Sequence, residues 1–526
     1  MYIPVIRQSV TVMLPPEMRS GECRKGNNLF CISGNLHLRL PSFLKCIAII
    51  RHVTMKRISC ILIAIFINPI LFAQKLSIAE EKKDFLVFKT ALREAHPGVY
   101  RFESRATIDS LFEQTENALK DSLSQQQFYQ ILSPLVAAMH CGHTKFNPEG
   151  RYDENHLYHY YYDTAQLFPL KLYFSGNKAF VVDSYDKSTT IEKGTEIIAI
   201  NGRPVNELIP YLFNNIVADG RVVSSKYLEL SNFFSAYYAN LVEGTQQFEL
   251  TVKKEDGKPF TRVVPATSLA IIREYEKSHM EHAVSAFELS FPRSRVAIMR
   301  IRAFYPFRKE DNFVAFLKKS FAEMEANKTG KLIIDLRDNE GGKDRWGAVL
   351  FSYLTDKPFR YYESLRIPSK NYTFRQYAQL PRFYGVLKLL MRKDPAGGYR
   401  WTKHKNLGIQ KPQKHPFTGE VVVLVNGSSF SVTAEFAAVA KASGRIKLAG
   451  EETGGTYSGN NSGTFVIVTL PNSRLSLGIP MVGYYMAVPE IQPFDRGVLP
   501  TLLISTSLQQ IMNGEDQVLE RALDDN

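Results

Sequence analysis

Short β-rich runs alternate with helical segments through the C-terminal half of the chain, and this alternation limits the fold more than any other pattern. The β-rich runs are Val296–Ile301, Lys331–Leu336 and Glu420–Val425. Between and after them, apolar residues recur at helical spacing, and we expect helices at Asp311–Ala326, Trp346–Leu354 and Val432–Ala442. Such alternation is typical of a layered α/β core. We therefore predict an α/β domain over residues 270–526, within a multidomain α+β chain.

Residues 74–166 have the pattern of a small helical cap domain. Apolar residues recur at helical spacing from Ala79 to Leu92, and the turn His96-Pro97-Gly98 ends that helix. Two further helices are expected near Ile108–Leu119 and Gln125–Met139.

Residues 167–265 change to a strand-rich pattern. Strands are expected at Leu170–Phe174, Lys178–Asp183 and Gln247–Val252, with an Asn201-Gly202 turn before a helix at Asn206–Phe213. This order resembles a PDZ domain, which binds extended peptide ends by adding a strand to a sheet edge. A hairpin-rich domain without a ligand is the alternative.

A targeting signal is predicted at residues 55–73. Met55-Lys56-Arg57 precedes the apolar run 58–72, and Ala73 supplies a small residue at the cleavage point. The run is short for a membrane span, and Asn68-Pro69 interrupts it. We therefore expect an exported protein, periplasmic or extracellular. Its mature form would lack residues 1–54 as well as the signal peptide. A buried helix or an uncleaved anchor is the alternative for 55–73, and a genuine extension is the alternative for 1–54.

Removal of residues 1–73 changes both the charge and the cysteine content. These residues carry nine Lys or Arg against two Asp or Glu, so they supply +7 of the formal net charge of +13. Four of the five cysteines lie there, which leaves Cys141 without a partner for a disulfide. The sequence contains no His-Glu-x-x-His, no paired cysteines and no phosphate-binding glycine loop, so we predict neither a metal nor a cofactor.

The segment 374–417 is strongly basic, with ten Lys or Arg and the single acid Asp394. One interpretation is a solvated, partly mobile loop. The other is a lid, or a surface that docks on an anionic partner such as the cell envelope. No nucleic-acid-binding signature accompanies the segment, and export argues against that partner.

Ser431 is the candidate nucleophile. A β-rich run ends at Val425, small polar residues turn the chain, and a helix is expected from Val432. Free backbone N–H groups and the helix dipole favour developing negative charge at such a position, which suits an acyl-transfer nucleophile. An ordinary N-cap serine is the alternative.

Three further motifs accompany Ser431 in a fixed order: Asp335-Leu-Arg-Asp-Asn-Glu-Gly-Gly, Gly450-Glu-Glu-Thr-Gly-Gly, and Gly497-Val-Leu-Pro followed by Asp516-Gln-Val-Leu-Glu-Arg-Ala-Leu. Together they resemble the carboxyl-terminal processing (tail-specific) serine protease family over roughly residues 80–525. The resemblance implies a crotonase-like layered core, peptide or protein substrates, and an acyl-enzyme on Ser431. A catalytically inactive peptide-binding or adaptor protein on the same scaffold is the alternative.

The resemblance also implies the other catalytic groups. Gly341 or Gly342 and the N–H of Val432 would form the oxyanion hole, although a tight turn alone would explain the two glycines. Many family members use a lysine base 25 residues after the serine, where this chain has Thr456. Lys441 and Lys447 lie elsewhere relative to that position.

A second, tricorn-type branch takes a histidine base from the cap. Gly142-His143-Thr144 matches that branch, so His143 is the candidate base. The carboxylate that orients the histidine would then be Asp495, with Glu435 as the competitor.

Overall fold

The computed structural model describes residues 75–147, 166–186, 189, 191–254, 257–279 and 285–524. The predicted signal peptide at 55–73 and the upstream segment 1–54 lie outside the described residues. From Leu76 onward the chain forms one compact unit by its internal contacts.

Three helices form the cap region, as the sequence predicts: α2 (Ile78–Ala95), α3 (Arg105–Ala118) and α4 (Gln125–Ala137). Each begins after a serine whose side chain accepts a hydrogen bond from the backbone N–H three residues later, and these serines are Ser77, Ser104 and Ser124. Strand β1 (Lys145–Asn147) then pairs antiparallel with β20 (Ser476–Met486) of the C-terminal region. This pairing ties the segment just before β1, which includes His143, to the core.

The region 167–265 contains a sheet with the order β2-β3-β4-β6-β7, with β5 paired to β4. Its strands are β2 (Leu170–Ser175), β3 (Lys178–Ser184), β4 (Glu196–Ile200), β5 (Arg203–Pro204), β6 (Gln247–Lys253) and β7 (Phe260–Pro265). Helix α6 (Val205–Phe213) lies where the sequence predicts it, whereas α7 (Ser224–Leu241) was missed. Helix α8 (Leu269–His279) follows the sheet. The PDZ-like assignment stays a prediction.

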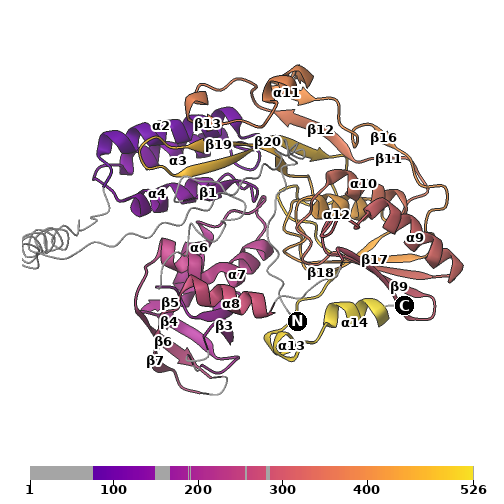
Figure 1. Ribbon diagram of the computed structural model, residues 1–526, viewed down its shortest axis with the longest axis horizontal. Helices are drawn as coiled ribbons and strands as arrows, with labels where there is room; N and C mark the ends of the chain where they lie inside the picture. The colour runs from indigo at the N-terminus through magenta and orange to yellow at the C-terminus, as the bar shows by residue number, and fades with distance from the viewer. Residues whose placement is uncertain are drawn as a thin grey trace, which may run out of the picture. The chain divides into compact units, whose positions relative to one another are not determined.

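The predicted α/β core is confirmed. One sheet has the order β21-β18-β17-β10-β9-β8, parallel from β21 to β9, with β8 antiparallel to β9. Figure 1 shows its strands beside helices α9, α10 and α12. The strands are β8 (Phe287–Arg293), β9 (Val296–Ile301), β10 (Lys331–Asp335), β17 (Glu420–Val425), β18 (Lys447–Gly450) and β21 (Leu502–Leu503). The helices are α9 (Phe313–Ala326), α10 (Asp344–Ser352) and α12 (Val432–Ala442).

A second sheet has the order β13-β19-β20-β12-β15-β14, with β1 also paired to β20. Its remaining strands are β12 (Tyr362–Ile367), β13 (Ala378–Gln379), β14 (Met391–Lys393), β15 (Tyr399–Trp401) and β19 (Asn461–Thr469). The basic segment 374–417 supplies β13, β14 and β15, together with η2 (Arg375–Tyr377), α11 (Tyr384–Leu390) and β16 (Ile409–Gln410), which pairs with β11 (Phe359–Arg360). The interpretation of this segment as a loop is therefore wrong for much of its length.

The segment between the C-terminal helices α13 (Leu508–Asn513) and α14 (Gln517–Asp524) is attached to the core through the motif that begins at Asp335. The buried Arg337 guanidinium binds Asp335 at 2.8 Å and Asp516 at 2.6 Å. Two of the motifs that carry the family resemblance thus meet in one ion-pair network. Within the described ranges, we find no helix that is both long and apolar enough to cross a membrane.

Candidate active site

Ser431 occupies a strained position between β17 and α12. Its backbone has φ 54° and ψ −123°, a combination that residues other than glycine rarely adopt. The Ser431 side chain makes no capping hydrogen bond to α12. An ordinary N-cap serine would make that bond, so the capping interpretation has no support in the geometry.

His143 lies against Ser431. Its Nε2 is 3.2 Å from Ser431 Oγ, and its ring stacks on Phe430 with 4.5 Å between the centroids. Thr144, the next residue, is held by the buried His96, whose Nε2 lies 2.9 Å from Thr144 Oγ1. The imidazole is therefore placed to take the serine proton.

The surroundings of His143 favour the neutral imidazole. Burial, and secondarily the positive charge of Lys145, lower the pKa of His143 to about 3. The ring is thus unprotonated at neutral pH, which is the form that accepts a proton. Its Nδ1 is buried and has no hydrogen-bond partner among the described residues.

Gly341, in the motif that begins at Asp335, approaches the nucleophile closely, whereas the next residue, Gly342, packs on the backbone of Phe304. Gly341 and Gly342 have φ of 102° and 140°. A Cβ on Gly341 would lie 2.8 Å from Ser431 Cβ and 2.9 Å from Val432 N, which leaves no room for a side chain.

Only some of the predicted oxyanion donors are available. The Gly341 N–H donates to Asn339 Oδ1 at 2.9 Å. We find no acceptor for the N–H of Gly342 or of Val432 in the part of the chain that the structure describes. These two N–H groups, unlike that of Gly341, are therefore not already engaged and could bind an oxyanion.

Neither carboxylate expected from the sequence contacts His143. Asp495 Oδ2 accepts a hydrogen bond from Arg221 Nε at 3.1 Å. Glu435 is buried and accepts from the Tyr362 hydroxyl at 2.6 Å and from Asn460 Nδ2 at 2.9 Å. The structure thus does not bring Asp495 or Glu435 to the imidazole, because each is held by another partner.

A different carboxylate, Asp219, lies beside His143. The residue is 1% exposed, and its Oδ1 accepts the Gly142 N–H at 2.8 Å. Its Oδ2 is buried without a partner within the described ranges. Sequence reasoning missed Asp219 because it follows His143 by 76 positions and belongs to no local motif.

The negatively charged form of Asp219 is disfavoured by burial. Burial raises its pKa to about 7, although the Gly142 N–H and the charges of Arg101 and Lys145 act in the opposite direction. The carboxyl group therefore gains and loses its proton near neutral pH.

The lysines that could replace the missing dyad base are engaged elsewhere. Lys441 Nζ donates to the Leu499 carbonyl at 2.6 Å, and Lys447 Nζ pairs with Glu420 at 3.1 Å. Thr456, at the dyad position, donates to the Gly459 carbonyl. None of these three side chains is a partner of Ser431.

The described residues include one cluster with the spacing of a metal site. Ligand atoms of Cys141, His143 and Asp219 lie within 4.8 Å of one another. The Cys141 thiol donates to the Asn461 carbonyl at 3.7 Å, and His143 Nε2 faces Ser431, so two of the three side chains already have other partners. We therefore assign no metal to this cluster.

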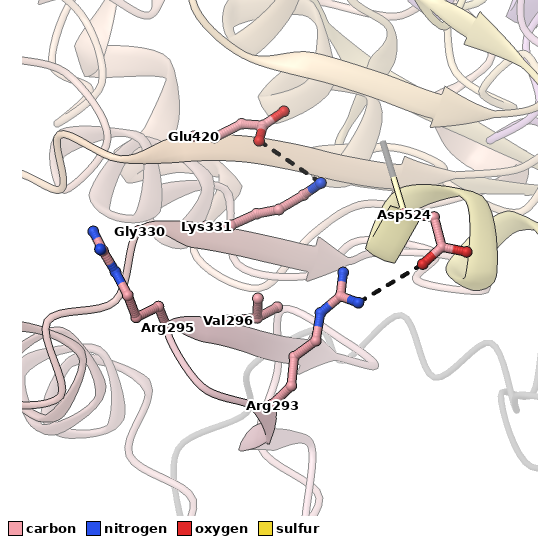
Figure 2. Close-up of a pocket in the computed structure, with 7 residues that line it drawn as sticks. All are labelled: Arg293, Arg295, Val296, Gly330, Lys331, Glu420 and Asp524. Atoms are coloured by element: carbon pink, nitrogen blue, oxygen red, sulfur yellow. Dashed lines mark ion pairs between the residues drawn. The ribbon is translucent and has the colours of Figure 1, made fainter. Parts of the chain in front are cut away.

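A pocket of about 350 Å³ lies at the amino-terminal ends of the central parallel strands (Figure 2). Its lining includes Val296, Lys331 and Glu420, the first residues of β9, β10 and β17. Ser431 and Gly341 instead follow the ends of β17 and β10. This pocket is consequently separate from the candidate active site.

Comparison with known proteins gives a match to one family model and matches to several solved structures. Residues 295–502 match the family described as Peptidase family S41. A crystal structure of a CPAF mutant has a TM-score of 0.59 and 13% identity, covering 85% of this chain and 98% of that one. Mature CPAF complexed with lactacystin has a TM-score of 0.58 and 14% identity, covering 85% and 99%. At such identities the likeness shows the fold. No curated protein sequence matches the chain.

Proposed function

The chain is a member of peptidase family S41 through residues 295–502, and on that premise we propose that it is an exported serine endopeptidase acting through an acyl-enzyme on Ser431. The observation that carries the proposal is the 3.2 Å approach of His143 Nε2 to the oxygen of a strained serine. A nucleophile beside a base is the arrangement that acyl transfer needs.

The proposed reaction has two halves. His143 Nε2 takes the Ser431 proton while the serine oxygen attacks the peptide carbonyl, whose oxygen becomes negative and binds the N–H groups of Gly342 and Val432. The imidazolium then gives its proton to the leaving amine, which leaves an ester on Ser431. Water, deprotonated by His143, attacks the ester, and the serine regains its proton as the acid product departs.

An inactive scaffold protein is the alternative, and the geometry speaks against it. Thr456 stands where many family members have a lysine, which motivates that alternative. Yet Ser431 makes no capping bond and faces a neutral imidazole. A protein that only bound peptides would have no need of this strained pairing.

The substrates are proposed to be peptides or proteins, and hydrolysis of a diverse peptide mixture tests this. Wild-type protein should cleave peptides, and Ser431→Ala should leave them intact while melting at a similar temperature, since no capping bond is lost. Full cleavage by a normally folded Ser431→Ala variant would eliminate Ser431 as the nucleophile.

We also propose that the basic segment 374–417 docks on an anionic lipid surface. Phe383, Val386 and Leu389 are 64%, 59% and 73% exposed on and beside α11. Exposed basic residues flank them at 382, 392 and 393. The segment's acid, Asp394, is already paired with Arg400 at 2.6 Å. Apolar side chains among uncompensated basic ones suit the interface of a negatively charged bilayer.

A further inference from the structure

We propose that Asp219 is the carboxylate that positions His143 for catalysis, an inference that rests on the proposed peptidase function. It would accept a hydrogen bond from His143 Nδ1–H through its Oδ2. Asp219 is thus a positioning residue that acts on the substrate through the imidazole.

The first argument is that the neighbouring side chains of His143 and Asp219 each have a buried polar atom without a hydrogen-bond partner among the described residues. These atoms are His143 Nδ1 and Asp219 Oδ2. An atom of each side chain lies within 4.8 Å of the other. Buried polar atoms are nearly always paired, and a hydrogen bond between His143 Nδ1 and Asp219 Oδ2 would satisfy both at once.

The second argument is that the turn carrying Asp219 is fixed against the segment carrying His143. Gly142 N–H donates to Asp219 Oδ1 at 2.8 Å, and the Gly220 N–H donates to the His140 carbonyl at 3.0 Å. The His140 ring also hydrogen-bonds the Gly220 carbonyl, at 2.9 Å from Nδ1. These hydrogen bonds fix the turn and engage one Asp219 oxygen, Oδ1. The other oxygen, Oδ2, is left available to His143 Nδ1.

The third argument concerns Asp495, which the family resemblance suggested for this role. Its backbone carbonyl accepts the Arg221 N–H at 2.7 Å. A Cβ on Gly220 would lie 2.1 Å from the same carbonyl oxygen, so the chain at Asp495 packs directly on the turn that carries Asp219. Asp495 therefore supports the turn with its backbone, while Asp219 supplies the carboxylate.

The chemical consequence is control of the tautomer. A hydrogen bond from Nδ1–H to Asp219 leaves Nε2 as the acceptor toward Ser431, and the carboxylate stabilises the imidazolium that forms during attack. Other charges near Asp219 come from Arg101, Lys145 and Glu435, with the Cys141 thiol alongside. Arg101 and Lys145 offer no acceptor, and Glu435 already accepts from Tyr362 and Asn460, so Asp219 is the carboxylate available to accept the Nδ1–H hydrogen bond.

Asp219→Asn tests the proposal because the amide oxygen can still accept from Gly142 N–H, and the NH₂ group, which is a donor, then faces Nδ1. We expect kcat to fall roughly 10²- to 10⁴-fold, as for a triad carboxylate replaced by its amide, with KM changed by less than about 2-fold. Asp495→Asn is the matched control. It retains the backbone acceptor for Arg221 and should keep kcat within about 3-fold of wild type.

A folded Asp219→Asn variant with wild-type kcat would overturn the proposal. If that variant does not fold, Asp219→Ser provides a smaller acceptor for Gly142 N–H, and full activity in it would overturn the proposal equally. Loss of wild-type activity in EDTA, restored by Zn²⁺, would also overturn it by giving the cluster to a metal. Wild-type protein that cleaves no peptide contradicts the proposed function itself, whereas an active enzyme insensitive to Asp219 contradicts this inference alone.

Discussion

The backbone around Ser431 depends on a glycine that touches the nucleophile. Gly341 has φ of 102°, and a Cβ there would approach Ser431 Cβ to 2.8 Å. Gly341→Ala should therefore displace Ser431 and lower kcat by ~10²-fold or more, since misplacement by about 1 Å has effects of that size. Backbone strain should also lower the free energy of unfolding by ~1–3 kcal/mol.

The control for this variant is Gly385→Ala in α11. A Cβ at Gly385 meets nothing within 4 Å. It should therefore leave activity unchanged and the unfolding free energy equal or slightly higher. Peptide hydrolysis and thermal melting of the two variants check the prediction. Equal activity in both would show that the approach of Gly341 to Ser431 is unimportant.

The pH dependence of activity should follow Asp219 rather than His143. The pKa of His143 is lowered to about 3, so this ring stays neutral from pH 5 upward. The pKa of Asp219 is raised to about 7, and its carboxylate form, which stabilises the imidazolium, exists above that value. Burial raises this pKa, and the Gly142 N–H and the charges of Arg101 and Lys145 partly offset that effect.

We therefore expect kcat to rise with pH through about 7, the pKa of Asp219. The Asp219→Asn variant should lack that rise. A pH–rate profile of both proteins is the measurement. An unchanged rise in Asp219→Asn would assign the titration to another group.

Helix α11 is the element expected to contact lipid. Replacing the exposed Phe383, Val386 and Leu389 by serine should weaken co-sedimentation with vesicles that contain anionic lipid. About 0.8 kcal/mol is lost for each buried CH₂ removed. Wild-type binding should weaken as salt rises, because the basic residues contribute by attraction to the lipid charge.

Val263→Ser is the matched control for the α11 variant, because Val263 is 57% exposed on β7, outside the basic segment. It should bind vesicles as wild type does. Equal binding to neutral and anionic vesicles, or binding only to acidic proteins, would exclude the anionic lipid surface as the partner.

The elements that the sequence predicts well are those defined by local pattern. Strands β9 and β17 and helix α12 have the predicted bounds, because β-branched runs and an alanine-rich segment determine them locally. The basic segment was misinterpreted because its strands have only two or three residues, and β13, β15 and β16 form by pairing with strands outside the segment.

The same reason separates the predictable part of the site from the rest. Ser431, His143 and the glycines belong to short motifs, whereas Asp219 reaches His143 only through the tertiary fold. The available oxyanion donors also required the structure, because the hydrogen bond from Gly341 N–H to Asn339 is not visible in a sequence.

At the scale of the whole molecule, the site joins two regions distant in sequence. His143 follows the cap helices and precedes β1, which pairs with β20, while Ser431 comes from the parallel sheet. The base and the nucleophile therefore meet only when the cap region is docked on the core.

Export is the other prediction that concerns the whole molecule. If residues 55–73 are a signal peptide, amino-terminal sequencing of the protein from its native host should begin at or near Gln74. Mature protein that retains residues 1–54 would contradict this prediction.

The most direct test of the proposed catalytic pair is labelling with a serine-directed phosphonate, followed by peptide mapping and intact-mass kinetics. Wild-type protein should gain one label, on Ser431, and Ser431→Ala should gain none. His143→Ala should label at least ~10²-fold more slowly, because the serine then lacks its base. Labelling of another residue, or of Ser431 at the wild-type rate in His143→Ala, would contradict the account.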